Sequence, residues 1–434
     1  MVTTPPLSPI ALSNFFNNLA DVIEEISGGP WQFIQLRGNP LSSEDIDRGD
    51  VDLLGSRDSV DRLLAAAKSW VQNGQCHLVV RARDANKTSV ILLSLDGRHV
   101  LKLDLWIKLW QIEDRNTHLQ YEDCQHLLSA SDASIKRLPP QIEASVYLHH
   151  LRTKQKSISS PHVQQRLTDY SKACLQAGAS DLSGALLRCA QNKIVDPTIL
   201  NIANVHLNEA RLLKSTKPRS RWRDKIPSEI TAAFLAPPRK IAHIAVMGCD
   251  GSGKTSLAAA QAATNPGKYS TFTGKRLYRN SLIYKFMVIA VRPLLFQGRE
   301  RFDDTLAPWN YLRALISLEA RVWFFPRGVT LIDRSLLDFL VVDRKSDNPR
   351  FHRASRHLFR FGRRIPTIHL LVPGDRLSSR KAEMTPTGHR IYDELIFNHA
   401  TQRFPTDYTL FFNGNDLDFS RSALDRVLSI VSKD

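Results

Sequence analysis

The sequence is poor in cysteine and contains no pattern that would pair the cysteines it has. Its 5 cysteines include no Cys-x-x-Cys pair, which argues against a zinc site or a disulfide framework and favours a reducing compartment. The N-terminus lacks a basic stretch followed by an apolar core, so no secretory signal peptide is expected. The longest apolar run, residues 281–296, is broken by Lys285, Arg292 and Pro293 and is too charged to span a bilayer. These absences predict a cytoplasmic protein.

Basic residues are in clear excess. The chain has 59 lysines and arginines against 43 acidic residues, a net charge of +16 at pH 7. Such a charge suits anionic partners such as nucleotides, nucleic acid or an anionic membrane surface, but it does not choose among them. Contact with nucleic acid, peripheral contact with a membrane and a homodimer are therefore left open. The length of 434 residues predicts two or three domains.

In the second half of the chain, an apolar stretch runs directly into a glycine-rich loop. Residues 241–247 are predicted to form a buried strand, the pattern Gly248-x4-Gly253-Lys254-Thr255 follows, and residues 256–263 favour a helix. The glycines let consecutive backbone N–H groups face an anion at the positive end of that helix. Lys254 can then reach the β- and γ-phosphates of ATP, and the Thr255 hydroxyl can ligate Mg²⁺. The residues predicted to bind the nucleotide are Gly248, Asp250, Gly251, Ser252, Gly253, Lys254, Thr255 and Ser256.

The loop Gly248-Cys-Asp-Gly-Ser-Gly-Lys-Thr-Ser256 resembles that of the thymidylate kinase family of P-loop kinases. The resemblance implies that Asp250 lies near the phosphate acceptor. A predicted strand that ends in Asp333-Arg334 is similar to the family's Asp-Arg element, which implies that Asp333 helps to hold Mg²⁺ and that Arg334 clamps the acceptor phosphate. After a later strand, Arg380 stands where the family carries its lid arginine, over the transferred group.

The region that grips the acceptor differs from this family. Residues 269–275 lack the Arg-Glu-Pro triplet with which thymidylate kinases hold the deoxynucleotide, and an apolar insertion with scattered cations, residues 276–302, follows. The acceptor is therefore left open, as a nucleotide or another small molecule that bears a hydroxyl or phosphate group.

Acidic residues near the N-terminus form a second pattern. In an extended strand, Asp50 and Asp52 point to the same face, and Asp104 lies on a second alternating strand. Neighbouring carboxylates repel one another unless a cation such as Mg²⁺ lies between them. This pattern resembles the nucleotidyltransferase superfamily, although Arg37-Gly38-Asn39 stands where that family carries Gly-Ser. The resemblance implies an α+β fold with Asp50, Asp52 and Asp104 as metal ligands; a solvated acidic loop or an inactive relic is the alternative.

Between these patterns, the spacing of apolar residues predicts helices over 138–151, 163–177, 182–191 and 198–213, with no convincing strand. A basic, proline-containing connection follows over residues 214–240. The chain is thus predicted to be an α/β protein in three segments. These are a nucleotidyltransferase-like domain (1–130), a helical module with a linker (131–237) and a P-loop kinase domain with a parallel sheet flanked by helices (238–434).

These patterns favour an ATP- and Mg²⁺-dependent phosphotransferase that resembles nucleoside-monophosphate kinases, fused to a nucleotidyltransferase-like domain. Its catalytic residues would be Lys254, Asp333, Arg334, Arg380 and Asp250. Two alternatives stay open. One is an ATP-dependent switch that acts on nucleic acid or a partner protein, and the other is nucleotidyl transfer as the main activity.

Overall fold

The fold is taken from a computed structural model of the chain. The structure describes residues 33–36, 50–82, 86–111, 117–128, 135–212, 243–273, 286, 289–290, 328–333, 366–373, 376–377, 385–401, 406–414 and 416–432. The predicted linker over residues 214–240 lies outside these ranges, as do Arg334 and Arg380. In the described part of the chain, no helix is both long and apolar enough to cross a membrane.

The chain divides into two compact units, each assembled from separate stretches of sequence. Unit 1 comprises residues 1–66, 86–89 and 101–227, and unit 2 comprises residues 67–85, 90–100 and 228–434. Residues 67–85 and 90–100 therefore belong to the same compact unit as the predicted kinase domain. The boundaries of the three predicted segments stay a prediction.

Unit 2 is built on a mostly parallel sheet, with strands in the order β10-β11-β9-β12-β13-β3-β4. The first five strands are parallel neighbours, and β13 pairs antiparallel with β3. The strands are β3 (His77–Ala82), β4 (Lys87–Leu93), β9 (His243–Gly248), β10 (Tyr269–Thr273), β11 (Val329–Asp333), β12 (Thr367–Leu371) and β13 (Thr406–Phe412). The first three residues of β4 belong to unit 1. Every residue of β9 is buried, as expected for a parallel strand covered on both faces.

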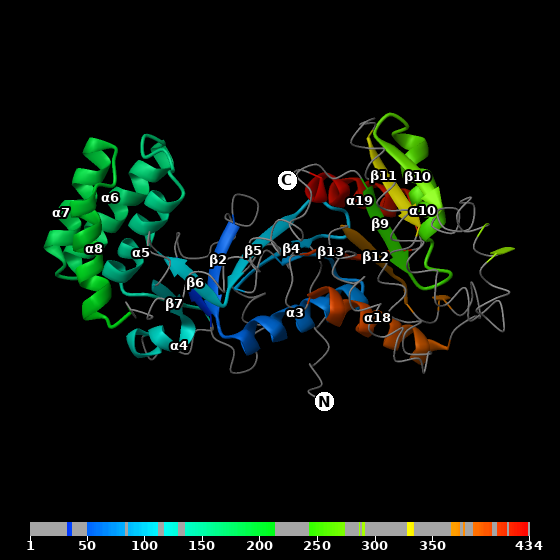
Figure 1. Cartoon of the computed structure of the whole chain (residues 1–434), viewed down its shortest axis with the longest axis horizontal. Coiled ribbons are helices and arrows are strands. Elements are labelled where there is room, and N and C mark those ends of the chain that lie inside the picture. Colours follow the sequence, from blue (N-terminus) through cyan, green and yellow to red (C-terminus); the bar gives the residue numbers. More distant parts are fainter. Residues whose placement is uncertain are drawn as a thin grey trace. The chain divides into compact units, whose positions relative to one another are not determined.

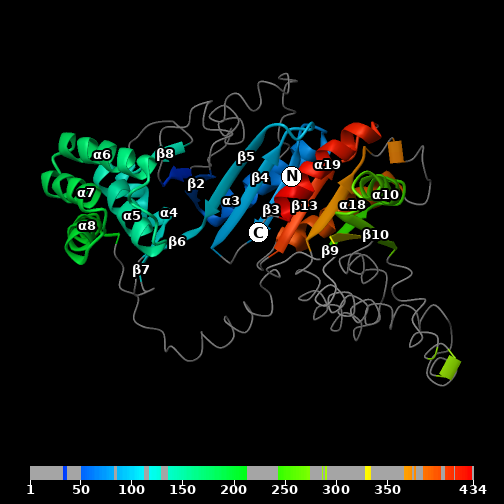
Figure 2. The same ribbon diagram turned by 90° about the horizontal axis from the view of Figure 1, so that it is seen from above.

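Among the described residues, three helices cover the parallel strands of unit 2. These are α10 (Lys254–Thr264), α18 (Pro386–Thr401) and α19 (Leu417–Val431). In Figure 1, α10 and α19 lie on one side of the sheet and α18 on the other; Figure 2 gives the view from above. Leu257 on α10 and Leu424 on α19 share one apolar cluster with Val246 and Leu370 from the strands. This core holds α10 against the sheet at the point where the glycine-rich loop begins.

Buried polar groups join β3 to the end of the chain. The His77 ring accepts a hydrogen bond from the Phe412 backbone N–H at 3.1 Å, and its other nitrogen contacts the Leu95 carbonyl at 3.1 Å. Burial lowers the pKa of His77 to about 4, so the ring is neutral at pH 7. Arg81 lies 3.5 Å from Asp407 and donates to the Ile430 and Val431 carbonyls at 3.0 and 3.2 Å. These contacts attach β3 to both β13 and α19.

Unit 1 contains a smaller group of strands in the order β5-β2-β1-β8. β2 pairs parallel with β5, whereas β1 pairs antiparallel with β2 and parallel with β8. The strands are β1 (Phe33–Gln35), β2 (Asp50–Gly55), β5 (Val100–Trp106) and β8 (Ile135–Arg137), with a separate hairpin of β6 (Lys108–Gln111) and β7 (Thr117–Gln120). No strand was expected in the helical segment, so β8 corrects that prediction; three residues are too few for an alternating pattern. The helices nearby are α3 (Arg57–Gln72), which crosses the division between the units, α4 (Tyr121–Cys124) and the 3₁₀ turn η2 (Gln125–Leu127).

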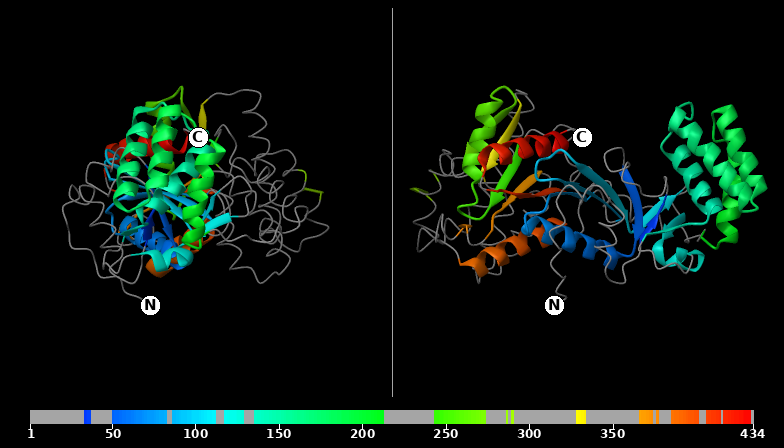
Figure 3. Two further views of the ribbon diagram at one scale, coloured as in Figure 1. Left: turned by 90° about the vertical axis from the view of Figure 1, so that its left-hand side faces the viewer. Right: turned by 180° about the vertical axis from the view of Figure 1, so that it is seen from behind.

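The helical module of unit 1 confirms the helices that the spacing predicts. It consists of α5 (Pro140–Thr153), α6 (Pro161–Gln176), α7 (Ser180–Asn192) and α8 (Pro197–Glu209), which Figure 3 shows packed side by side. Prolines stand in the first turn of α5, α6 and α8, where the missing N–H costs nothing. Asp196 caps α8 by accepting from the Ile199 N–H at 2.9 Å. Leu148, Leu167, Leu186 and Ile199 share one apolar core.

Candidate phosphate-binding site

The glycine-rich loop joins the end of β9 to the start of α10. Since β9 lies between β11 and β12, the loop stands at the carboxyl edge of parallel strands, where ligands of open α/β sheets bind. Gly248, Gly251 and Gly253 have φ angles of 144°, 88° and 86°. These backbone conformations disfavour any residue with a side chain.

Two of these glycines also lack room for a side chain. A Cβ atom at Gly248 would lie 2.7 Å from both the Leu370 carbonyl oxygen and the Ser252 hydroxyl. One at Gly253 would lie 2.7 Å from Nδ2 of Asn413. The loop is therefore tightly packed against β12 and the end of β13.

Lys254 lies inside the loop, with its side chain only 12% exposed. Its ammonium donates to the carbonyls of Gly248 at 2.6 Å and Cys249 at 3.0 Å, and it lies 3.6 Å from Oδ1 of Asp250. These acceptors hold a positive charge beneath the turn. Ser256, in the first turn of α10, is exposed.

Asp333 and Thr255 meet at the edge of the loop. The Thr255 hydroxyl donates to Oδ2 of Asp333 at 3.2 Å. Asp333 is the last residue of β11, which pairs with β9. The second carboxylate oxygen of Asp333 is buried, and none of the described residues pairs with it; the same is true of the buried Ser252 hydroxyl. Mg²⁺ prefers oxygen ligands and commonly binds one or two carboxylates together with substrate phosphates. The oxygens of Thr255 and Asp333 therefore fit a Mg²⁺ ion.

Asn413 contacts the glycine-rich loop from the end of β13, and the sequence does not reveal this contact. Its side chain is buried and donates from Nδ2 to the Ser252 carbonyl at 2.6 Å, while its backbone N–H donates to the Leu371 carbonyl at 2.8 Å. The resemblance to P-loop kinases implies that residues 413–415 lie near the adenine, and this stays a prediction. The structure places Asn413 against the phosphate loop, and an asparagine directly after a buried strand is the only signal of this contact in the sequence.

The structure describes some of the predicted catalytic residues but not all of them. The structure brings together Lys254, Asp250, Thr255 and Asp333 around one loop. Arg334 and Arg380 lie outside the described residues, so their roles stay predictions.

The predicted N-terminal acids lie in unit 1. Asp52 and Asp104 are register partners on the parallel strands β2 and β5, and Asp50 is the partner of Lys102. Asp52 accepts from the Trp106 indole N–H at 3.0 Å. Asp104 lies 2.6 Å from the Lys87 ammonium and accepts from the Ser89 hydroxyl at 2.6 Å.

Both carboxylates thus have hydrogen-bond partners in the protein. Within the described ranges, no group of three His, Cys, Asp or Glu side chains is arranged to hold a metal ion. The side chain of Asp50 lies outside those ranges, so the three-carboxylate metal site stays a prediction.

Comparison with known proteins finds no family model that matches the sequence and no curated protein that matches it. Among solved structures, a gluconokinase from Sinorhizobium meliloti 1021 is 17% identical, with a TM-score of 0.26 over 45% of this chain and 96% of that chain. A sugar kinase from Janibacter sp. HTCC2649 is 15% identical, with a TM-score of 0.25 over 44% of this chain and 96% of that chain. A shikimate kinase from Acinetobacter baumannii in complex with shikimate is 14% identical, with a TM-score of 0.25 over 47% of this chain and 98% of that chain. TM-scores below 0.5 do not establish a shared fold.

Proposed function

We propose that the chain is an ATP- and Mg²⁺-dependent phosphotransferase of the P-loop kinase type, with a thymidylate-kinase-like module over residues 238–434. The contact between Thr255 and Asp333 carries the proposal. It places two oxygen ligands beside a loop of the phosphate-binding type, and one carboxylate oxygen is buried without a partner among the described residues. A glycine-rich turn with a purely structural role does not call for such an acid.

The loop supplies most of the affinity for phosphate. Backbone N–H groups at the start of α10 face the nucleotide at the positive end of the helix dipole. Lys254 exchanges the carbonyls of Gly248 and Cys249 for the β- and γ-phosphate oxygens, which bear more negative charge. Bound Mg²⁺, held by Thr255 and Asp333, would neutralise charge on the same oxygens.

The remaining roles concern the acceptor. Asp250 and Arg334 lie at the acceptor group in this proposal, and Arg380 lies over the transferred phosphoryl group. Catalysis then depends on positioning and electrostatic stabilisation rather than on a covalent intermediate. The acceptor is a nucleotide or another small molecule with a hydroxyl or phosphate group.

Loss of the Lys254 ammonium tests this proposal. We expect Lys254→Ala to lower ADP release by about 100-fold or more, because the β/γ-phosphates lose their closest cation. The variant should keep the thermal unfolding midpoint of the parent. Lys268→Ala, at an exposed lysine just after α10, is the matched control and should keep normal turnover. Unchanged ADP release in Lys254→Ala would refute the assignment.

Residues 1–130 form, in this proposal, a nucleotidyltransferase-like domain that precedes the helical module and linker of residues 131–237. The adjacent positions of Asp52 and Asp104 support the likeness, with Asp50, Asp52 and Asp104 as the metal ligands. If this domain transfers nucleotides, pyrophosphate release will be lost in Asp52→Ala. Absence of pyrophosphate with every nucleotide and acceptor offered would show that the domain is an inactive relic.

A further inference from the structure

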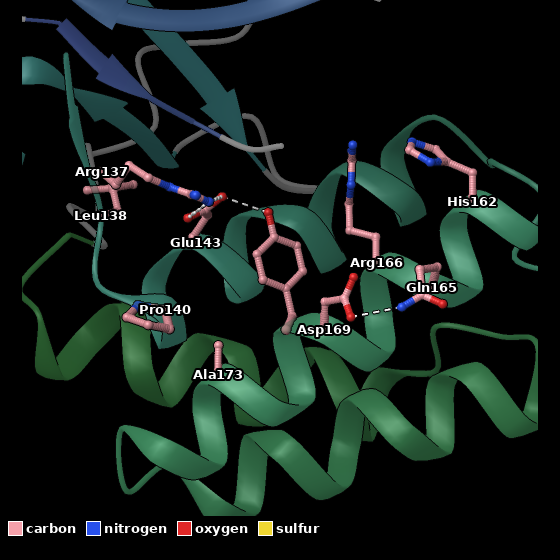
Figure 4. Close-up of a pocket in the computed structure, with 10 residues that line it drawn as sticks. Arg137, Leu138, Pro140, Glu143, His162, Gln165, Arg166, Asp169 and Ala173 are labelled. Atoms are coloured by element: carbon pink, nitrogen blue, oxygen red, sulfur yellow. Dashed lines mark hydrogen bonds and ion pairs between the residues drawn. The ribbon is translucent and has the colours of Figure 1, made fainter. Parts of the chain in front are cut away.

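A pocket in the helical module has no part in the function proposed above. It measures about 420 Å³ and lies between the start of α5 and one face of α6, entirely within unit 1. Volumes of this order are typical of sites for small organic molecules. Arg137, Glu143, His162, Gln165, Arg166 and Tyr170 are among its lining residues (Figure 4).

One wall of the pocket is a buried ionic network. Glu143 is 2% exposed. Its two carboxylate oxygens accept from Nη2 of Arg137 at 2.7 and 2.8 Å, and one of them also accepts from the Tyr170 hydroxyl at 2.7 Å. Burial raises the pKa of Glu143, while Arg137, the Tyr170 hydroxyl and the positive charge of Arg166 partly offset that effect. Arg137 compensates the negative charge of Glu143, and the network fixes the shape of this wall.

Much of the remaining lining comes from one face of α6. His162, Gln165, Arg166 and Asp169 follow the spacing that places side chains on one side of a helix. The Arg166 guanidinium lies over the Tyr147 ring at 5.4 Å. In the described part of the chain, no oxygen accepts a hydrogen bond from Arg166. Gln165 donates to Asp169 at 2.9 Å, so amide and carboxylate groups lie at the same rim (Figure 4).

This arrangement selects the chemistry of a ligand. A guanidinium fork matches the oxygens of a phosphate group, and the cation of Arg166 is not compensated by a direct ion pair among the described residues. Gln165 and Asp169 suit hydroxyl groups at the exposed rim. We propose that the pocket binds a small organic phosphate, with the phosphate on Arg166 and the hydroxyl groups of its sugar on Gln165 and Asp169.

Calorimetric titration of the full chain tests this site. The probes are ribose 5-phosphate and adenosine monophosphate, with ribose, inorganic phosphate and glucuronate for comparison. Titrations in the Lys254→Ala background separate this pocket from the glycine-rich loop. We expect both organic phosphates to bind in that background, and Arg166→Gln to weaken binding about tenfold or more. Arg166→Lys should fall in between, because it keeps the charge and loses the fork.

Lys172→Gln is the matched control, since Lys172 is an exposed cation on the same helix outside the pocket. Lys172→Gln should bind as the parent does, and circular dichroism should show all three α6 variants folded. The proposal is overturned if neither organic phosphate binds at millimolar concentration, or if Arg166→Gln binds as tightly as Lys172→Gln. It is also overturned if ribose, inorganic phosphate or glucuronate binds as tightly as ribose 5-phosphate. Since Lys254 takes no part in this site, failure here leaves the proposed phosphotransferase untouched.

Discussion

The two oxygens of Asp333 have different surroundings. Oδ2 accepts from the Thr255 hydroxyl at 3.2 Å, while Oδ1 is buried and no described residue pairs with it. Burial of a carboxylate oxygen without a partner costs free energy, which a bound cation or water recovers. The buried oxygen of Asp333, without a partner among the described residues, supports the proposed role of Asp333 as a Mg²⁺ ligand.

Asp333→Asn measures this role. The amide keeps the size of the side chain and removes its charge, so we expect the Mg²⁺ concentration for half-maximal ADP release to rise about tenfold or more. A titration of turnover against Mg²⁺ measures the change. Asp418→Asn, at an exposed acid on α19, should leave the titration unaltered. The same Mg²⁺ dependence in Asp333→Asn and the parent would remove Asp333 from the metal site.

The candidate site could be predicted from the sequence where one local motif fixes its geometry. Lys254, Thr255 and the glycines lie within eight consecutive residues, so the spacing alone brings them together. Asn413 could not be found in this way. It reaches the Ser252 carbonyl across 161 positions of sequence, and nothing in the pattern around either residue specifies that contact.

At the scale of elements, the strands and helices were more predictable than their pairing. The continuous apolar run of residues 241–247 predicts β9, and the helical spacing of apolar residues predicts the helices of the module. These local patterns do not predict that β3 pairs with β13. The two strands lie far apart in the sequence: the Phe412 N–H donates to the His77 ring across 335 positions. Strand pairing depends on tertiary packing, which local periodicity does not encode.

Arg81 links three of these elements, and its removal tests how strongly β3 is attached. We expect Arg81→Ala to lower the free energy of unfolding by about 3–5 kcal/mol, because Asp407 stays buried without its cation and the last carbonyls of α19 lose their donor. Urea denaturation followed by circular dichroism gives the value. Arg421→Ala removes a partly exposed cation on α19 and should cost less than about 0.5 kcal/mol. If Arg81→Ala lowered the free energy of unfolding no more than Arg421→Ala does, other contacts would be holding β3 in place.

In the whole molecule, the compact units do not coincide with continuous segments of the chain. Unit 2 takes residues 67–85 and 90–100 from the first half of the chain and residues 228–434 from the second. The sequence predicts a kinase-like module that starts near residue 238, but the compact unit around the phosphate loop includes strands from far upstream. The candidate site in unit 2 is the loop at Gly248, whereas unit 1 contains the proposed N-terminal acids and the helical pocket.

In the proposed function, the chain moves the γ-phosphoryl group of ATP to an acceptor. The alternative is a nucleotide-dependent switch that only hydrolyses ATP in response to nucleic acid or a partner protein. Both require the same loop, so the destination of the phosphoryl group separates them.

The most direct measurement follows γ-labelled ATP with the full chain and a panel of nucleoside monophosphates, sugars and hydroxy acids. We predict that the label appears on one class of acceptor, in amounts equal to the ADP formed, and that Lys254→Ala abolishes the transfer. Release of all the label as inorganic phosphate, at a rate that no acceptor changes and that DNA or RNA stimulates, would contradict the proposed phosphotransferase activity.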